Sequence, residues 1–146
     1  MKKITAFLLT GIISVCFSQN NWIYYNKVST ETEGYYSIWR INQDGENDTL
    51  IFEMGYLLDV SEDGNFMLFA NSGAVKRYNF STVTLDDISI ETYAAKFTSD
   101  ASSIIYASQT ELFIYNIDSQ ENIMISDSLS YESNFHYSPV NNSVVF

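Results

Sequence analysis

A pattern that returns about every 37 residues constrains the fold of this chain more than any other feature of its sequence. In each copy, a polar turn leads into a short apolar run with an aromatic residue near its end. The three copies lie at 61–70, 98–107 and 138–146. A second pattern keeps the same spacing, because strand-like segments end at Asn42, Asn79 and Asn116. Two patterns with one period indicate a repeat architecture, in which each unit needs its neighbours to bury its apolar surface.

The repeated segments have the character of β-strands. They are short, rich in Ile, Val, Phe, Tyr and Leu, and separated by Gly, Asn, Asp and Ser, while helical periodicity is poor. We expect strands in the second unit near 55–60, 66–70, 74–79 and 86–91. In the third unit we expect them near 93–98, 103–107, 111–116 and 121–125. Four strands in a unit of this length are typical of a propeller blade, so the sequence predicts an all-β, partial β-propeller of four-stranded antiparallel blades.

Apolar runs such as Met67-Leu68-Phe69 do not alternate with polar residues. A strand that is half exposed would show such alternation. Blades stack face to face, so we expect both faces of these strands to be buried.

The units run roughly over 19–54, 55–91 and 92–127, followed by an incomplete unit at 128–146. We expect three strands in the first unit, which would lack its innermost strand, and two in the last. Because propellers close with 4–8 blades, we interpret the chain as the N-terminal portion of a longer propeller whose open edges could self-associate. An alternative is that several three-unit chains assemble into one ring.

Residues 1–18 have the layout of a secretory signal peptide. Lys2 and Lys3 precede a mostly apolar run from Ile4 to Val15, and small residues then suit cleavage before Gln19. The run is short for a membrane span. We therefore expect a secreted or periplasmic protein. A second interpretation is a lipoprotein signal, in which Cys16 would carry the lipid anchor.

The turns resemble those of TolB-like, WD-repeat-like β-propellers. Ser61-Glu62-Asp63-Gly64 and Thr98-Ser99-Asp100-Ala101 are similar to the Ser-Pro-Asp-Gly turn that precedes an apolar strand in that family. The stretch Ile41–Gly45 is similar to the family's next strand and its Asp-Gly turn. The sequence departs from the pattern where Glu62 and Ser99 replace proline. The resemblance implies a propeller with an extracytoplasmic role such as partner docking near the envelope.

Composition excludes several classes of site. With 18 acidic and 7 basic residues the formal charge is −11, which disfavours nucleic acid as a partner. Cys16 is the only cysteine, so neither a disulfide framework nor a cysteine zinc site can form. His136 is the only histidine, and in an aromatic strand we interpret it as a packing residue. We expect no metal, no cofactor and no transmembrane helix.

We assign the recurrent acidic residues to turns. An aspartate side chain can bond the backbone two residues on, and paired catalytic carboxylates would not recur blade by blade. The turn positions are Asp44, Gly45, Asp63, Gly64, Asp100 and Asp118. Most early aromatic residues fall on strands and suit the core, whereas we expect Tyr35 and Tyr36 to be exposed contact residues.

These residues contain no catalytic constellation, so we expect a non-enzymatic protein-binding or scaffold module. An alternative is the substrate-gating propeller of a prolyl-oligopeptidase-type serine peptidase. Its catalytic domain would lie beyond Phe146 and would carry a Gly-x-Ser-x-Gly nucleophile elbow.

Overall fold

The computed structural model describes residues 15–17, 21–28, 35–126, 135–138, 141 and 143–145. Every regular element in these ranges is a β-strand, and every strand pair is antiparallel. The strands form three four-stranded sheets and one two-stranded sheet, each in sequence order. The prediction of an all-β fold with four-stranded antiparallel blades is therefore confirmed.

The first blade consists of β1 (Val15–Phe17), β2 (Trp22–Val28), β3 (Tyr36–Asn42) and β4 (Thr49–Phe52). The second consists of β5 (Tyr56–Val60), β6 (Phe66–Asn71), β7 (Ala74–Asn79) and β8 (Thr84–Glu91). The third consists of β9 (Ala95–Phe97), β10 (Ser103–Ser108), β11 (Glu111–Asn116) and β12 (Asn122–Ser126). The last sheet pairs β13 (His136–Ser138) with β14 (Ser143–Val145). The side chain of His136 lies outside the described residues.

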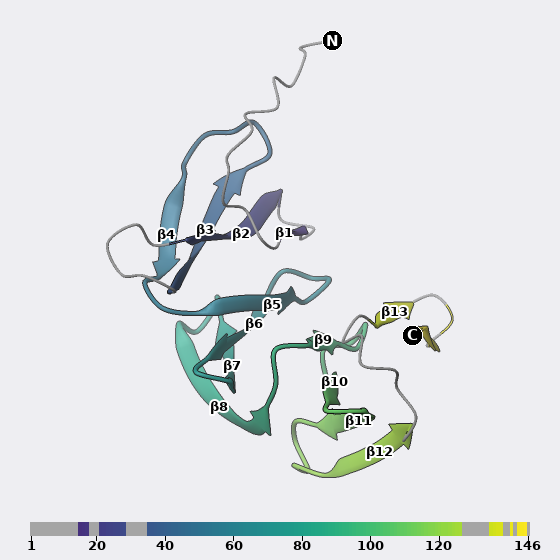
Figure 1. Cartoon of the computed structure of the whole chain (residues 1–146). Coiled ribbons are helices and arrows are strands. Elements are labelled where there is room, and N and C mark those ends of the chain that lie inside the picture. The colour runs from purple at the N-terminus through teal and green to yellow at the C-terminus, as the bar shows by residue number, and fades with distance from the viewer. Residues whose placement is uncertain are drawn as a thin grey trace.

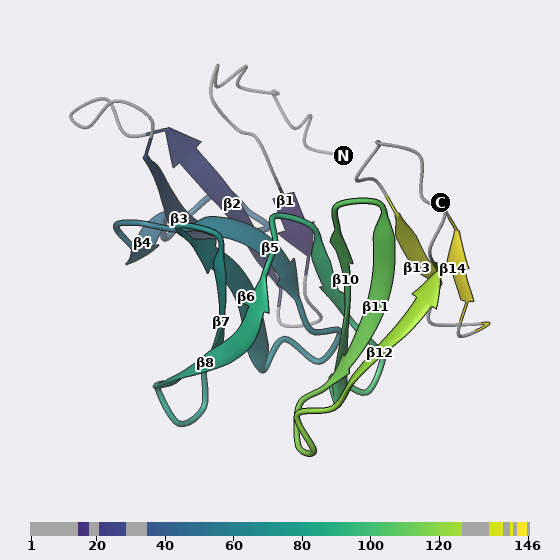
Figure 2. The same ribbon diagram turned by 60° about the horizontal axis from the view of Figure 1, so that its bottom comes forward.

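The blades fan out around a common centre (Figure 1). The first strand of each sheet lies toward this centre, and β4, β8 and β12 form the outer edges. Figure 2 shows the second and third sheets standing side by side, as stacked propeller blades do.

The expectation that the first unit lacks its innermost strand was wrong. Val15–Phe17 pairs antiparallel with Ile23–Tyr25 and completes a four-stranded sheet. A short apolar segment next to the open edge of β2 can satisfy the unpaired backbone groups of that edge. This strand belongs to the segment for which the sequence predicts a signal peptide. Cleavage before Gln19 stays a prediction, and it would remove β1 and leave the mature first blade with β2, β3 and β4.

Stacked blades share three apolar interfaces. Met67 and Phe69 of β6 pack in the cluster between the first and second blades, together with Tyr24 and Ile38. Leu68 of the same strand points the other way, into the cluster between the second and third blades. A third cluster joins β10 and β11 to the last sheet. The consecutive apolar residues of β6 are thus buried on both faces, which removes any need for alternation.

Polar side chains also bridge neighbouring blades. Asn26 of β2 is fully buried and accepts a hydrogen bond from the backbone N–H of Leu57 in β5, at 2.9 Å. Asp59 of β5 accepts one from the N–H of Phe97 in β9, also at 2.9 Å. Since each buried backbone group needs a partner, these bonds fix how far each blade can slide on the next.

Candidate functional site

The connections between strands alternate between two ends of the blades, because neighbouring strands are antiparallel. All the predicted turn residues lie at the end that carries the β3–β4, β5–β6, β9–β10 and β11–β12 turns. Tyr35 and Tyr36 lie at the opposite end, where β2 connects to β3. The topology therefore separates the acidic turns from the predicted contact aromatics.

Asp63 and Asp100 hold equivalent turns. The Oδ1 atom of Asp63 accepts hydrogen bonds from the Ser61 hydroxyl, at 2.6 Å, and the Asn65 N–H, at 3.0 Å. Asp100 accepts them from the Thr98 hydroxyl, at 2.8 Å, and from the backbone N–H two residues on, at 3.1 Å. Burial alone would raise the pKa of Asp63, but these bonds lower it on balance. The bond from Thr98 is the main cause of the lowered pKa of Asp100.

A left-handed residue follows each of these aspartates. Gly64 has φ 71° and Ala101 has φ 55°, so the same backbone is kept where glycine is replaced. Because a side chain is disfavoured in this conformation, the Asp100 hydrogen bonds help to hold Ala101 there.

The β3–β4 and β11–β12 turns are held by local side-chain bonds too. In the first, Asp44 accepts from the N–H of Glu46, at 3.0 Å, around Gly45. In the turn that contains Asp118, the acceptor is Asn116, which bonds the N–H of Ser119 at 2.9 Å. The described residues contain no group of three His, Cys, Asp or Glu side chains that could hold a metal ion.

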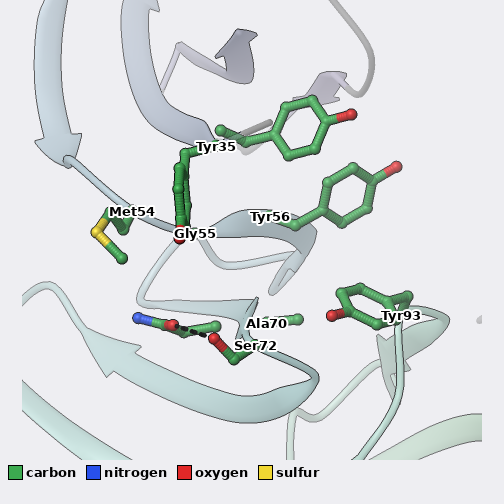
Figure 3. A pocket seen from close by; sticks show the side chains of 9 residues that line it. Tyr35, Met54, Gly55, Tyr56, Ala70, Ser72 and Tyr93 are labelled. Atoms are coloured by element: carbon green, nitrogen blue, oxygen red, sulfur yellow. Dashed lines mark hydrogen bonds between the residues drawn. The ribbon is translucent and has the colours of Figure 1, made fainter. Parts of the chain in front are cut away.

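A cavity of about 540 Å³ opens at the opposite end, between the first and second blades. We call it the tyrosine groove (Figure 3). Its lining residues are Tyr35, Tyr36, Met54, Gly55, Tyr56, Ala70, Asn71, Ser72 and Tyr93. Each comes from the end of a strand or from a connection between strands, and no side chain in the lining is charged.

Four tyrosine rings line the groove. Tyr36 is half-buried, and its ring meets that of Tyr56 edge to face with centroids 5.4 Å apart. The Tyr56 ring lies 6.4 Å from that of Tyr93. Tyr35 is 48% exposed and Tyr93 is 63% exposed. The rings of Tyr35, Tyr56 and Tyr93 form a row across connections of successive blades (Figure 3).

Sequence reasoning missed Tyr93 and assigned Tyr56 to the core. A signal for both was present, because Tyr56 and Tyr93 are 37 residues apart and so occupy the same position of the repeat. That position precedes or begins the innermost strand of a blade.

Gly55 lines the groove where its backbone packs closely against the interface between the first two blades. A Cβ atom at this position would lie 2.8 Å from the ring of Phe69 and 3.1 Å from Cδ1 of Ile38. The backbone carbonyl of Gly55 accepts a hydrogen bond from the amide of Asn26, at 3.1 Å. The blade interface thus holds the connection that presents Met54 and Tyr56.

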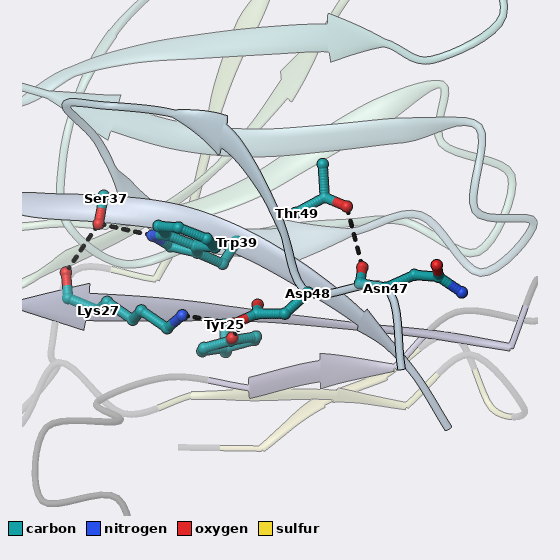
Figure 4. Close-up of polar contacts among 7 residues, drawn as sticks. All are labelled: Tyr25, Lys27, Ser37, Trp39, Asn47, Asp48 and Thr49. Carbon is teal, nitrogen blue, oxygen red and sulfur yellow. Dashed lines mark hydrogen bonds and ion pairs between the residues drawn. The ribbon is translucent and has the colours of Figure 1, made fainter. Parts of the chain in front are cut away.

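A second cluster of polar contacts lies on the first blade (Figure 4). The Lys27 ammonium is 2.7 Å from Asp48 and 3.6 Å from the ring centroid of Trp39. The Tyr25 hydroxyl donates to Asp48 at 2.5 Å. Burial, with the Asp48 carboxylate beside it, raises the pKa of Tyr25. Burial opposes ionisation of Asp48, but the bonds from Lys27 and Tyr25 lower its pKa overall. Both shifts move away from the near-neutral pKa that suits proton transfer.

Comparison with known proteins identifies the fold. No protein-family model matches the chain, and no curated protein matches its sequence. Among solved structures, an auxiliary nutrient binding protein from Bacteroides thetaiotaomicron is similar, with TM-score 0.69, 11% identity and coverage of 92% of this chain and 35% of that one. The β-propeller domain of the Trilobed protease from Pyrococcus furiosus has TM-score 0.62, 13% identity and coverage of 77% and 41%.

The extracellular domain of a protein described as a one-component system from B. thetaiotaomicron is also similar, with TM-score 0.58 and 18% identity over 92% of this chain and 19% of that one. The chain spans less than half the length of each of these neighbours. In the described residues, no helix has the length and apolarity that crossing a membrane requires. The chain is part of a β-propeller, with three four-stranded blades followed by a two-stranded sheet in the part that the structure describes.

Proposed function

We propose that the chain is the N-terminal portion of an extracytoplasmic, non-enzymatic β-propeller that binds a protein partner through the tyrosine groove. The observation that carries this proposal is the exposure of tyrosine rings from several blades around one uncharged cavity. Tyrosine is enriched at protein interfaces because its ring supplies apolar area while its hydroxyl remains solvated.

Further observations support this proposal. The signal-like segment 1–18 and the resemblance of the turns to TolB-like propellers agree with an envelope or secreted location. One structural neighbour is described as a nutrient binding protein and another as an extracellular domain. The acidic turns lie at the other end of the blades, and their aspartates accept hydrogen bonds from backbone N–H groups of the same turns.

Photo-crosslinking in cells that express the full-length protein tests the binding role. A photoreactive residue in place of Tyr93 should give a defined adduct, and Tyr35→Ala in the same chain should abolish it. A photoreactive residue in place of Val83, which is 72% exposed in the β7–β8 turn at the opposite end, is the matched control. Equal adducts from both positions would contradict binding at the groove.

The predicted location needs its own measurement. Mass spectrometry of the exported protein should find an N-terminus at Gln19. A lipid-modified N-terminus at Cys16 would instead establish the lipoprotein interpretation, and a cytoplasmic protein with residues 1–18 intact would contradict export.

A second candidate is the substrate-gating propeller of a prolyl-oligopeptidase-type serine peptidase. The likeness to the propeller domain of the Trilobed protease favours it. Sequencing of the reading frame past Phe146 discriminates the two functions. A Gly-x-Ser-x-Gly motif within an α/β-hydrolase pattern would establish the peptidase, whereas further propeller units alone would support the binding module.

A further inference from the structure

Two exposed glutamates lie next to the lining of the tyrosine groove in sequence or in strand register. Glu53 is exposed and directly precedes the lining residue Met54. Glu91 is exposed at the end of β8, where it pairs in register with Ala74, next to the turn that contains Ser72. The four ion pairs among the described residues all use aspartates, so neither glutamate contributes to one.

Basic side chains of the described residues are engaged elsewhere. Lys27, Lys76, Arg77 and Lys96 each lie within 4.0 Å of an aspartate. Arg40 stacks over the ring of Trp22, with its Cζ atom 4.3 Å from the centroid. The border of the groove therefore combines uncompensated carboxylates with exposed aromatic rings, on a chain whose formal charge is −11.

We propose that the groove takes an extended, arginine-containing segment of the partner protein. Guanidinium groups of that segment lie against the rings of Tyr35, Tyr56 and Tyr93 and pair with Glu53 and Glu91. This inference rests on the proposed binding function and specifies the partner's chemistry.

The arrangement of the rings favours a linear segment. Three rings in a row across successive blades offer a line of contacts, whereas a compact cation would need rings that surround one point (Figure 3). Arginine fits better than lysine, because its planar guanidinium stacks on aromatic faces and also forks onto carboxylates.

The chain already uses such contacts in its own packing. A basic side chain lies over the rings of Trp22, Trp39 and Phe66, at 4.3, 3.6 and 5.2 Å from the centroid. The groove tyrosines take part in none of the cation–π contacts found among the described residues. The exposed rings of Tyr35 and Tyr93 thus remain open to a cation from outside. A neutral oligosaccharide would stack on the same rings but would gain nothing from the glutamates.

Fluorescence anisotropy with labelled peptides tests this inference. The probe is a short, arginine- and proline-rich peptide, and its matched forms carry serine or glutamate in place of arginine. We expect saturable binding of the arginine form, at least about tenfold weaker binding of the serine form, and a loss of affinity with added salt.

Variants locate the contact. Tyr93→Ala should weaken binding at least about tenfold, and Glu91→Gln should weaken it about threefold while reducing its salt dependence. Val83→Ala should change it less than about twofold. Unfolding midpoints equal to that of the wild type establish that the variants are folded.

The outcomes separate the two proposals. If the arginine peptide fails to bind, or the serine form or a neutral oligosaccharide binds as tightly, the inference about the partner's chemistry is wrong. The proposed function would still stand if the Tyr93 photo-adduct forms and depends on Tyr35. If no ligand and no photo-adduct depends on the groove tyrosines, both proposals fail.

Discussion

The buried amide of Asn26 connects the first blade to the second, and its removal provides the sharpest test of how the blades are joined. The side chain is 0% exposed. Its Oδ1 atom accepts from the N–H of Leu57 at 2.9 Å, and its Nδ2 atom donates to the carbonyls of Gly55 at 3.1 Å and Ser37 at 3.3 Å. Asn26→Ala leaves all three backbone groups without this partner.

The expected cost follows from these bonds. The two shorter bonds contribute about 1 kcal/mol each to the free energy of unfolding, and a buried N–H left unsatisfied adds about 1 kcal/mol more. We therefore expect Asn26→Ala to lower this free energy by about 3 kcal/mol. For a chain of this size, that corresponds to a drop in Tm of roughly 10 °C.

Asn26→Asp separates the hydrogen bonds from side-chain volume. It keeps an acceptor for Leu57 but removes the donor to Gly55 and buries a carboxylate, so it should destabilise at least as strongly at neutral pH. Protonation of that carboxyl should restore part of the stability as the pH falls.

Urea unfolding followed by circular dichroism measures both variants, with Gln43→Ala as an exposed control that should change the free energy by less than about 0.5 kcal/mol. A loss below about 1 kcal/mol for Asn26→Ala would refute the reasoning, because water or a small backbone shift would then be satisfying the groups.

Three further predictions concern packing and charge. Gly55→Ala should lower the free energy of unfolding in urea by about 1–3 kcal/mol, because its Cβ would lie 2.8 Å from the ring of Phe69. Gly45→Ala is the control: its Cβ would have no atom within 4 Å, so only the backbone strain at φ +85° should cost stability, about 1 kcal/mol. Because the pKa of Asp48 is lowered, its stabilising effect is present above its ordinary pKa of 3.8 and is lost as the pH falls through the lowered value. The difference in free energy of unfolding between wild type and Asp48→Asn should therefore shrink on acidification. An unchanged difference would contradict the ion pair. Burial raises the pKa of Asp59, so the folded state binds its proton more tightly than the unfolded state does, and this residue favours folding more as the pH falls toward 3.8. Asp59→Asn should therefore leave the free energy of unfolding at neutral pH unchanged or increased. A loss above about 2 kcal/mol would show that the charge of Asp59 is needed.

The positions of the strands could be read from the sequence because they depend on local chemistry. The run at 66–70 and the segment ending at Asn79 correspond to β6 and β7, and they are joined by the left-handed turn at Ser72 and Gly73. A short apolar segment between turn-forming residues has few alternatives to a strand, and a repeat multiplies the evidence for each unit.

The innermost strand of the first blade could not be read in this way. Val15–Phe17 looks like the end of a signal segment when viewed alone. Its pairing with β2 depends on an edge that exists only once the blade has formed.

The tyrosine groove likewise depended on the tertiary structure. Sequence reasoning expected Tyr35 and Tyr36 to be exposed contact residues, but it assigned Tyr56 to the core and overlooked Tyr93. The four tyrosines come from three connections, and they meet because antiparallel strands bring those connections to one end of stacked blades.

The sequence by itself determined the period, the β character of each unit and the residues that form the turns, since these follow from the preferences of neighbouring residues. Only the tertiary structure decided which blade faces bury which side chains, where β1 pairs and which tyrosines line a common groove. Those features arise from contacts between residues far apart in the chain, and the geometry of stacking sets them.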